Sequence, residues 1–155
     1  MKFEHLLQIN DPANPLLLPL TRAQLWKGLL FRVEDATPFL PGLESCRIVE
    51  RHPDHLRRVL DFGAAVIHDT VTMAEAEWVR FDIAPTGQHA GGSLTISIEE
   101  PETGMLFLRF AYATSFGDVA GSEDQAYADY IRSAYHQSDI DCVRTIREML
   151  QQTTH

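Results

Sequence analysis

The chain has 155 residues, of which 45% are hydrophobic and 23% are charged, and its formal net charge is −9 at pH 7. These values are typical of one globular domain, since a chain of this length buries roughly 70% of the surface that it exposes when unfolded. An acidic surface repels phosphate groups, so we expect no nucleic-acid partner. No apolar run approaches the roughly 20 residues that a membrane helix needs, so we expect no membrane insertion.

Residues 1–10 lack the positively charged start and the apolar stretch of a secretory signal peptide, so we expect a cytoplasmic protein. In that compartment disulfides are rare. We therefore interpret Cys46 and Cys142 as small buried hydrophobic side chains rather than as a disulfide.

The first two predicted elements are a strand and a helix. The strand covers residues 3–10 and places Phe3, His5, Leu7 and Ile9 on one face. A connection that contains prolines follows it. The helix covers residues 21–35, and Thr21 is its expected N-cap because Gln24 follows three residues later, as in a capping box.

Six further strands are predicted, over residues 43–51, 55–62, 64–73, 76–84, 93–100 and 105–115. The alternation is clearest where Leu94, Ile96 and Ile98 alternate with polar residues. One long helix then runs from about Ser122 to the C-terminus, with an apolar stripe made of Tyr127, Ile131, Ala134, Ser138, Cys142, Ile146 and Met149. This order predicts an α+β fold, in which a curved antiparallel sheet of about seven strands surrounds the long helix and encloses a cavity.

Three stretches of the chain resemble the motifs of a known family. They are Asn10-Asp11-Pro12 through Gly28-Leu29, Phe39-Leu40-Pro41-Gly42, and Leu94-Thr95-Ile96-Ser97-Ile98-Glu99-Glu100-Pro101. The family is the AtaL-like branch of the START-like, or SRPBCC, superfamily, which also holds pollen allergens and lipid-transfer proteins. The resemblance implies one START-like domain over residues 1–155 with the helix-grip fold. It implies no particular reaction, because the superfamily includes binders, carriers, polyketide cyclases and aromatases.

Strand alternation predicts which side chains of the hairpin around Gly63 point into the cavity. The inner set is the less polar one and contains Leu56, Arg58, Leu60, Ile67, Asp69, Val71 and Met73. We therefore predict that Arg58 and Asp69 lie inside and close together. Two interpretations stay open, since the pair either orients a ligand or satisfies its own charges.

The same rule applies to the last three strands. It sends Val79, Phe81 and Ile83 inward opposite Leu94, Ile96 and Ile98, and it leaves Trp78 and Arg80 outside. On the final strand both faces are apolar, and the better inner set is Leu106, Leu108, Phe110 and Tyr112. Phe107 and Arg109 are then outside, although a shift of one residue would send Arg109 into the cavity. Apolar side chains on the outer face favour a covering element or a homodimer.

The titratable residues give no metal or cofactor signature. Neither His52 with His55 nor His136 with Asp139 and Asp141 has the spacing of a metal site. The histidines of both sets are interpreted as solvated surface groups. Three further acids, Glu99, Glu100 and Glu102, lie at a predicted hairpin tip in open solvent, and we interpret them as solubilising. His5 shares a face with apolar residues, and is either a core histidine or an acid or base in the cavity.

The leading interpretation is a protein that binds a small hydrophobic molecule, aromatic or polyketide-like, without a cofactor or metal. The expected ligand-binding residues are His5, Arg58, Asp69, Phe81, Ile96, Phe110, Tyr112 and Tyr127. One alternative is an enzyme of the polyketide cyclase or aromatase type that uses the same polar groups, with catalytic residues unassigned. The other is an interaction module with a collapsed cavity that dimerises through the outer sheet face.

Overall fold

The computed structural model describes residues 2–86, 91–114 and 122–153, except for the side chains of residues 122–128 and 153. Its elements are β1 (Lys2–Gln8), α1 (Arg22–Glu34), β2 (Ser45–Arg51), β3 (Leu56–Asp61), β4 (Val66–Ala74), β5 (Trp78–Ile83), β6 (Gly92–Glu102), β7 (Met105–Thr114) and α2 (Ser122–Thr153). Each lies within a few residues of its predicted range. Within the described residues, no helix is long and apolar enough to cross a membrane.

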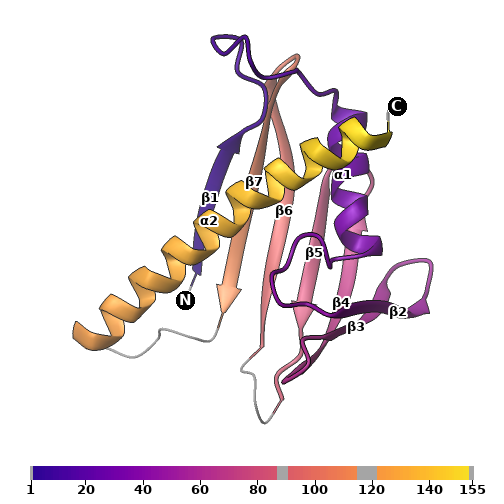
Figure 1. The fold of residues 1–155 in the computed structure, drawn as a ribbon, viewed down its shortest axis with the longest axis vertical. Coiled ribbons are helices and arrows are strands. Elements are labelled where there is room, and N and C mark those ends of the chain that lie inside the picture. Colours follow the sequence, from indigo (N-terminus) through magenta and orange to yellow (C-terminus); the bar gives the residue numbers. More distant parts are fainter. Residues whose placement is uncertain (1, 87–90, 115–121, 154–155) are drawn as a thin grey trace.

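The strands form one antiparallel sheet in the order β1-β7-β6-β5-β4-β3-β2. Consecutive strands from β2 to β7 are neighbours, whereas β1 pairs with β7 at the opposite end of the chain order. Helix α2 crosses one face of the sheet diagonally, and α1 lies on the same face beside its C-terminal half (Figure 1). This arrangement confirms the predicted α+β fold, with the sheet on one side and both helices on the other.

The burial pattern confirms the predicted inner face of the sheet. The buried strand residues include Arg58, Leu60, Asp69, Val71, Val79, Phe81, Leu94, Ile96, Ile98, Leu106, Leu108, Phe110 and Tyr112. They alternate with exposed or half-buried residues along every one of these strands. The uncertain register of β7 is thereby settled, since Phe110 pairs with Ile96 on the inside and Arg109 lies on the outer face.

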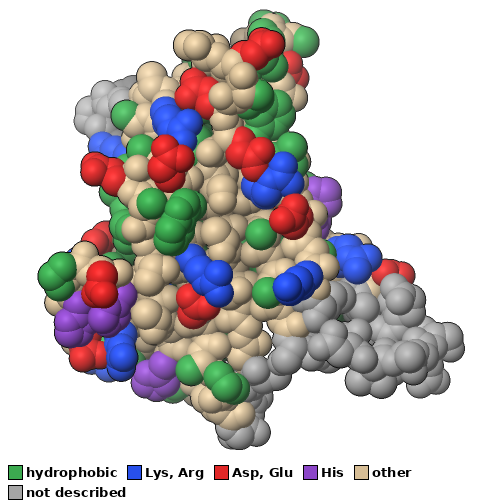
Figure 2. Space-filling model, turned by 180° about the vertical axis from the view of Figure 1, so that it is seen from behind, with side chains coloured by type: hydrophobic (Ala, Val, Ile, Leu, Met, Phe, Trp, Pro, Cys, Tyr) green, Lys and Arg blue, Asp and Glu red, His purple; other side chains and the backbone are tan. Residues whose placement is uncertain are grey.

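The outer face of the sheet carries charged side chains of both signs (Figure 2). Arg109 forms ion pairs with Glu99 and, at 3.0 Å, with Glu4. Arg80 pairs with Asp82 at 2.9 Å. The outer face of β7 is therefore mixed rather than apolar, and Glu99 is paired with a neighbouring strand instead of serving only solubility.

The entry into α1 is fixed by side-chain hydrogen bonds. Thr21 Oγ1 accepts from the Gln24 amide at 3.1 Å and Gln24 Oε1 accepts from the Thr21 amide at 2.9 Å, which confirms the capping box. Just before it, the buried Asn10 side chain donates to the carbonyls of Leu20 and Gly104 at 2.9 and 2.8 Å. The connection after β1 is thus attached both to α1 and to the β6–β7 turn.

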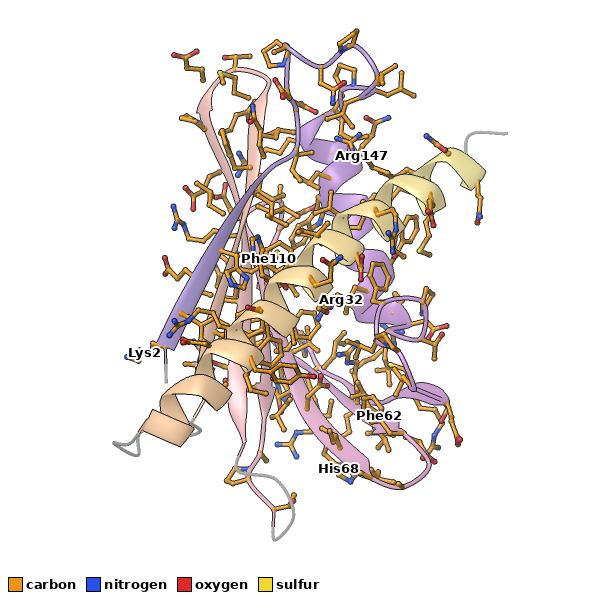
Figure 3. All side chains as sticks on the ribbon, turned by 60° about the vertical axis from the view of Figure 1, so that its left-hand side comes forward. Lys2, Arg32, Phe62, His68, Phe110 and Arg147 are labelled. Atoms are coloured by element: carbon orange, nitrogen blue, oxygen red, sulfur yellow. The ribbon has the colours of Figure 1, made fainter. Side chains whose placement is uncertain are left out.

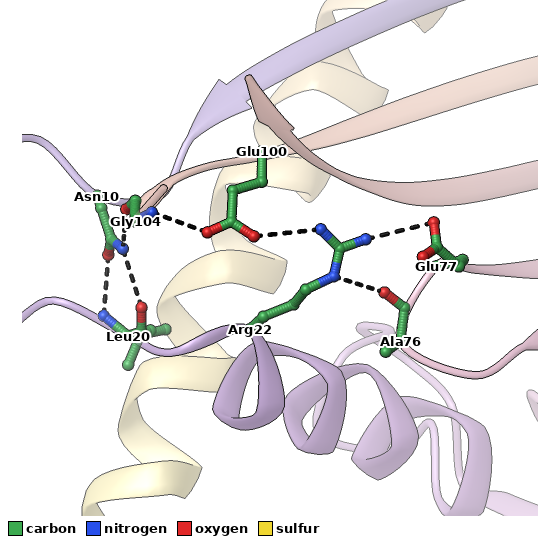
Figure 4. A network of polar contacts seen from close by, with 7 residues as sticks. All are labelled: Asn10, Leu20, Arg22, Ala76, Glu77, Glu100 and Gly104. Atoms are coloured by element: carbon green, nitrogen blue, oxygen red, sulfur yellow. Dashed lines mark hydrogen bonds and ion pairs between the residues drawn. The ribbon is translucent and has the colours of Figure 1, made fainter. Parts of the chain in front are cut away.

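Arg22 at the start of α1 joins three parts of the chain (Figure 4). Its Nε donates to the Ala76 carbonyl at 2.9 Å, and its terminal nitrogens pair with Glu77 and Glu100, each at 3.3 Å. Glu100 also accepts from the Gly104 amide at 2.8 Å. The prediction of a purely solubilising Glu100 is therefore wrong, because this carboxylate holds the hairpin turn against α1.

The two helices approach each other closely at Gly28 and Ile146. A Cβ atom on Gly28 would lie 2.3 Å from Ile146 Cγ2, so this position has no room for a side chain. Next to it Trp26 is buried with only 8% of its surface exposed. Contact between the helices thus depends on a glycine in the middle of α1.

The predicted stripe of α2 is confirmed in part. Among the described side chains of the helix, the buried ones are Asp139, Cys142, Ile146 and Leu150, of which Cys142 and Ile146 belong to the stripe. Ala134 is exposed, and Ile131, Ser138 and Met149 are half-buried. Because α2 crosses the sheet diagonally, its first turns project beyond β1 and only the later turns cover the core (Figure 1). The side chain of Tyr127 lies outside the described residues.

Candidate ligand-binding site

A cavity of about 160 Å³, partly open to solvent, lies between the sheet, α1 and α2. Its apolar lining includes Leu60, Ile67, Phe81, Ile83 and Leu94, and its polar lining includes Arg32, Arg58, Asp69, Ser93, Tyr112, Thr114 and Ser138. For scale, an apolar cavity of about 150 Å³ engineered in another protein holds benzene. The space therefore suits one aromatic ring with a small substituent.

Arg58 and Asp69 form a buried ion pair on the cavity wall, as predicted. Arg58 Nε and Nη2 donate to the two carboxylate oxygens of Asp69 at 3.0 and 2.7 Å. Its Nη1 donates to the carbonyls of Arg32 and Val33, both at 2.9 Å, at the end of α1. Two of the acceptors are thus the last free carbonyls of a helix, where a cation also interacts favourably with the helix dipole. These four hydrogen bonds favour an architectural role for Arg58.

Arg32 is a second buried arginine that the sequence interpretation missed. It lies on the last turn of α1 with 8% of its surface exposed, and it lines the cavity. Figure 3 places its side chain between α2 and the sheet. Its position three residues after Leu29 and seven after Leu25 puts it on the buried face of the helix, and this spacing was the signal available in the sequence.

His5, Asp139 and Tyr112 form a hydrogen-bonded chain behind the cavity. Asp139 is completely buried, its Oδ2 lies 2.6 Å from His5 Nδ1, and its Oδ1 accepts a hydrogen bond from the Tyr112 hydroxyl. Burial raises the pKa of Asp139, although both hydrogen bonds favour its ionised form. The sequence interpretation noted Asp139 only as a neighbour of His136 and missed its buried position.

The same chain connects the cavity with the protein surface. Tyr112 lines the cavity, and burial together with the neighbouring Asp139 raises the pKa of its phenol, which stays protonated and donates. At the other end the ring of His5 lies 4.5 Å from that of the exposed His136. The hydrogen-bonded chain therefore links Tyr112 at the cavity wall with His5, whose ring lies beside an exposed histidine.

The other predicted site residues are spread between the cavity and the core. Phe81 lines the cavity, and both Arg32 and Arg58 lie over its ring, at 5.3 and 5.0 Å from the centre. Ile96 and Phe110 are completely buried in the core and do not line the cavity. In the part of the chain that is described, no three histidine, cysteine or acidic side chains are grouped so that they could hold a metal ion.

Comparison with known proteins identifies the family. The model of the family described as acetylaranotin biosynthesis cluster protein L, or AtaL, matches residues 7–153. This chain belongs to the AtaL family. No curated protein matches the AtaL-family chain in sequence.

Solved structures share the fold of this AtaL-family protein at low sequence identity. The di-domain ARO/CYC StfQ from the steffimycin biosynthetic pathway has a TM-score of 0.69 at 10% identity, over 99% of this chain and 51% of StfQ. The chain thus spans about half the length of StfQ. The Zhui aromatase/cyclase from Streptomyces sp. R1128 has a TM-score of 0.61 at 12% identity, over 100% of this chain and 96% of its own. Ara h 8.0201 has a TM-score of 0.63 at 15% identity, over 98% of each chain. These likenesses show the helix-grip fold.

Proposed function

We propose that this protein binds a small hydrophobic molecule, aromatic or polyketide-like, in the cavity under α2. The observation that carries the proposal is the cavity of about 160 Å³, whose apolar wall of strand residues faces a few fixed polar groups. Small-molecule sites in proteins have this composition, with apolar walls and few polar groups that orient the ligand.

The size of the cavity also sets the expected affinity. An aromatic ring buries roughly 200 Å² of surface, and apolar burial contributes about 25 cal/mol per Å². The resulting free energy of about 5 kcal/mol corresponds to a Kd of about 0.1–1 mM, before the costs of ordering. Tighter binding therefore requires one of the polar groups.

The test is binding of a neutral aromatic probe, benzamide, measured by chemical-shift changes in amide NMR spectra. Native mass spectrometry of the freshly purified protein, in parallel, would detect a retained small molecule. Leu94→Trp fills the cavity from its wall, and Thr95→Trp places the same side chain on the opposite face of β6. We expect at least tenfold weaker binding in Leu94→Trp and unchanged binding in Thr95→Trp. Equal binding by the two variants, or none by the wild type, contradicts the proposal.

A second candidate function is an enzyme of the aromatase or cyclase type. It is favoured by the chain of hydrogen bonds from His5 through Asp139 to the Tyr112 hydroxyl, which ends at the cavity. Because the Tyr112 proton is donated to Asp139, the phenol oxygen could accept a hydrogen bond from an enol or hydroxyl group of the ligand and position it. If so, a β-polyketone thioester should be turned over, and Tyr112→Phe should lower kcat while the protein still binds benzamide. Binding without turnover favours the carrier.

A further inference from the structure

Among the described residues, no carboxylate contacts the guanidinium of Arg32, although Asp139 lies near enough to interact with its charge. The single side-chain hydrogen bond of Arg32 runs from Nη1 to Cys142 Sγ at 3.4 Å, and among the described residues Arg32 has no ion pair. A thiol is a weak acceptor, and burial raises the pKa of the Cys142 thiol, which keeps that group neutral. Removing a cation from water is costly unless a counter-charge comes close, so this arrangement calls for an anion.

Arg58 provides an internal comparison, since both guanidinium groups lie over the same Phe81 ring. Arg58 is held by Asp69 and by two helix carbonyls. Arg32 has neither kind of partner. Arg58 is thus fixed by hydrogen bonds within the protein, whereas Arg32 retains donors that form no hydrogen bond among the described residues.

The remaining donors of Arg32 are Nε and Nη2, on a residue that lines the cavity. Within the described residues, every side-chain nitrogen or oxygen without accessible surface has a hydrogen-bond partner. Nε and Nη2 of Arg32 form no hydrogen bond, so they retain accessible surface, and Arg32 lines the cavity. Together these two nitrogens form the planar fork that binds a carboxylate with two parallel hydrogen bonds.

The other acids near Arg32 are engaged elsewhere. Asp69 binds Arg58 with both oxygens. Asp139 is shared between His5 and Tyr112. A ligand that supplies its own negative charge would therefore meet a cation that no protein carboxylate contacts.

We propose that the ligand is a small aromatic carboxylate, whose acid group is bound by Arg32 while its ring occupies the apolar space beside Phe81 and Leu94. This inference rests on the proposed ligand-binding function and names the ligand class. The cavity of about 160 Å³ matches a single ring with one carboxylate. The charged anchor adds the affinity that burial of a ring alone does not supply.

The test compares benzoate with benzamide, which has nearly the same shape and no charge. We expect the wild type to bind benzoate at least ten times more tightly than benzamide. Arg32→Gln should bring this ratio close to one. Lys27→Gln, an exposed site on the same helix, is the matched loss of one positive charge and should keep the ratio.

A second readout needs no variant and covers the case in which Arg32→Gln does not fold. The Nε–H resonance of Arg32 should shift downfield with benzoate and stay in place with benzamide. An unmoved resonance, equal affinity for both probes, or a ratio that survives in Arg32→Gln overturns the carboxylate proposal. If benzamide still binds in those cases, the proposed function stands. If neither probe binds, both proposals fail.

Discussion

Arg58 and Asp69 lie directly opposite each other on β3 and β4, and the guanidinium contacts both carboxylate oxygens at 3.0 and 2.7 Å in the buried interior. The same guanidinium donates to the carbonyls of Arg32 and Val33. The pair therefore attaches the end of α1 to the sheet, and it fixes the turn of helix from which Arg32 projects into the cavity.

Truncating Asp69 to Ala should destabilise the protein by about 3–5 kcal/mol, because Arg58 is then left as a buried charge without its partner. The measurement is the free energy of unfolding in urea. Replacing both residues, as Arg58→Ala with Asp69→Ala, should cost less than the sum of the two single alanine changes, since no charge is stranded. Small losses that simply add would show that the two side chains do not interact.

Asp139→Asn should change how stability depends on pH. Because burial raises the pKa of Asp139, the folded state holds this proton more tightly than the unfolded state does. Its contribution is therefore most favourable below the unfolded pKa of about 3.9 and is lost as the pH rises through the folded pKa. Asn cannot ionise, so the variant should lose less stability than the wild type between pH 4 and pH 7. Identical slopes for the two proteins would contradict the expectation.

Gly28→Ala should destabilise the protein even though alanine is the better helix former by about 1 kcal/mol. The new Cβ would lie 2.3 Å from Ile146 Cγ2, and overpacking of this kind costs about 1–3 kcal/mol. Adding Ile146→Ala removes the clashing atoms, so the double variant should be more stable than the two single losses predict. Thermal unfolding of the four proteins tests this, and a more stable Gly28→Ala would show that the helices are further apart.

Trp26→Ala should cost about 3–5 kcal/mol, since the Trp26 side chain on α1 is buried in the core. The exposed neighbour Lys27 provides the control, and Lys27→Ala should change stability by less than about 0.5 kcal/mol. Both values come from urea unfolding. A loss below about 1 kcal/mol for Trp26→Ala would place the indole at the surface.

Much of the sheet could be predicted from the sequence because successive side chains of a strand point to opposite faces. Only two assignments of the inner face are then possible, and the less polar set of side chains is the inner one. The inner positions of Arg58 and Asp69 followed from that choice alone. The buried face of a helix is harder to predict from the sequence. Ser138 and Asp139 lie four and three residues before Cys142, so either could share its buried face. Only the diagonal path of α2 across the sheet decides that Asp139 is the buried one. The shape and size of the cavity depend on how the helices pack on the sheet, and local sequence patterns do not predict this packing.

The pairing of β1 with β7 also has a consequence for the order in which the protein folds. Residues 2–8 bond to residues 107–113, about a hundred positions later, whereas the other neighbouring strands are hairpins that can form locally. Closing so long a loop costs conformational entropy before the contacts between the two strands stabilise it, so this step is slow. Proteins rich in such long-range strand pairings typically fold in milliseconds to seconds. The bond between His5 and Asp139 spans an even longer separation. A nascent chain can therefore assemble β2 to β7 as it emerges, but the His5–Asp139–Tyr112 chain forms only after α2 has been synthesised.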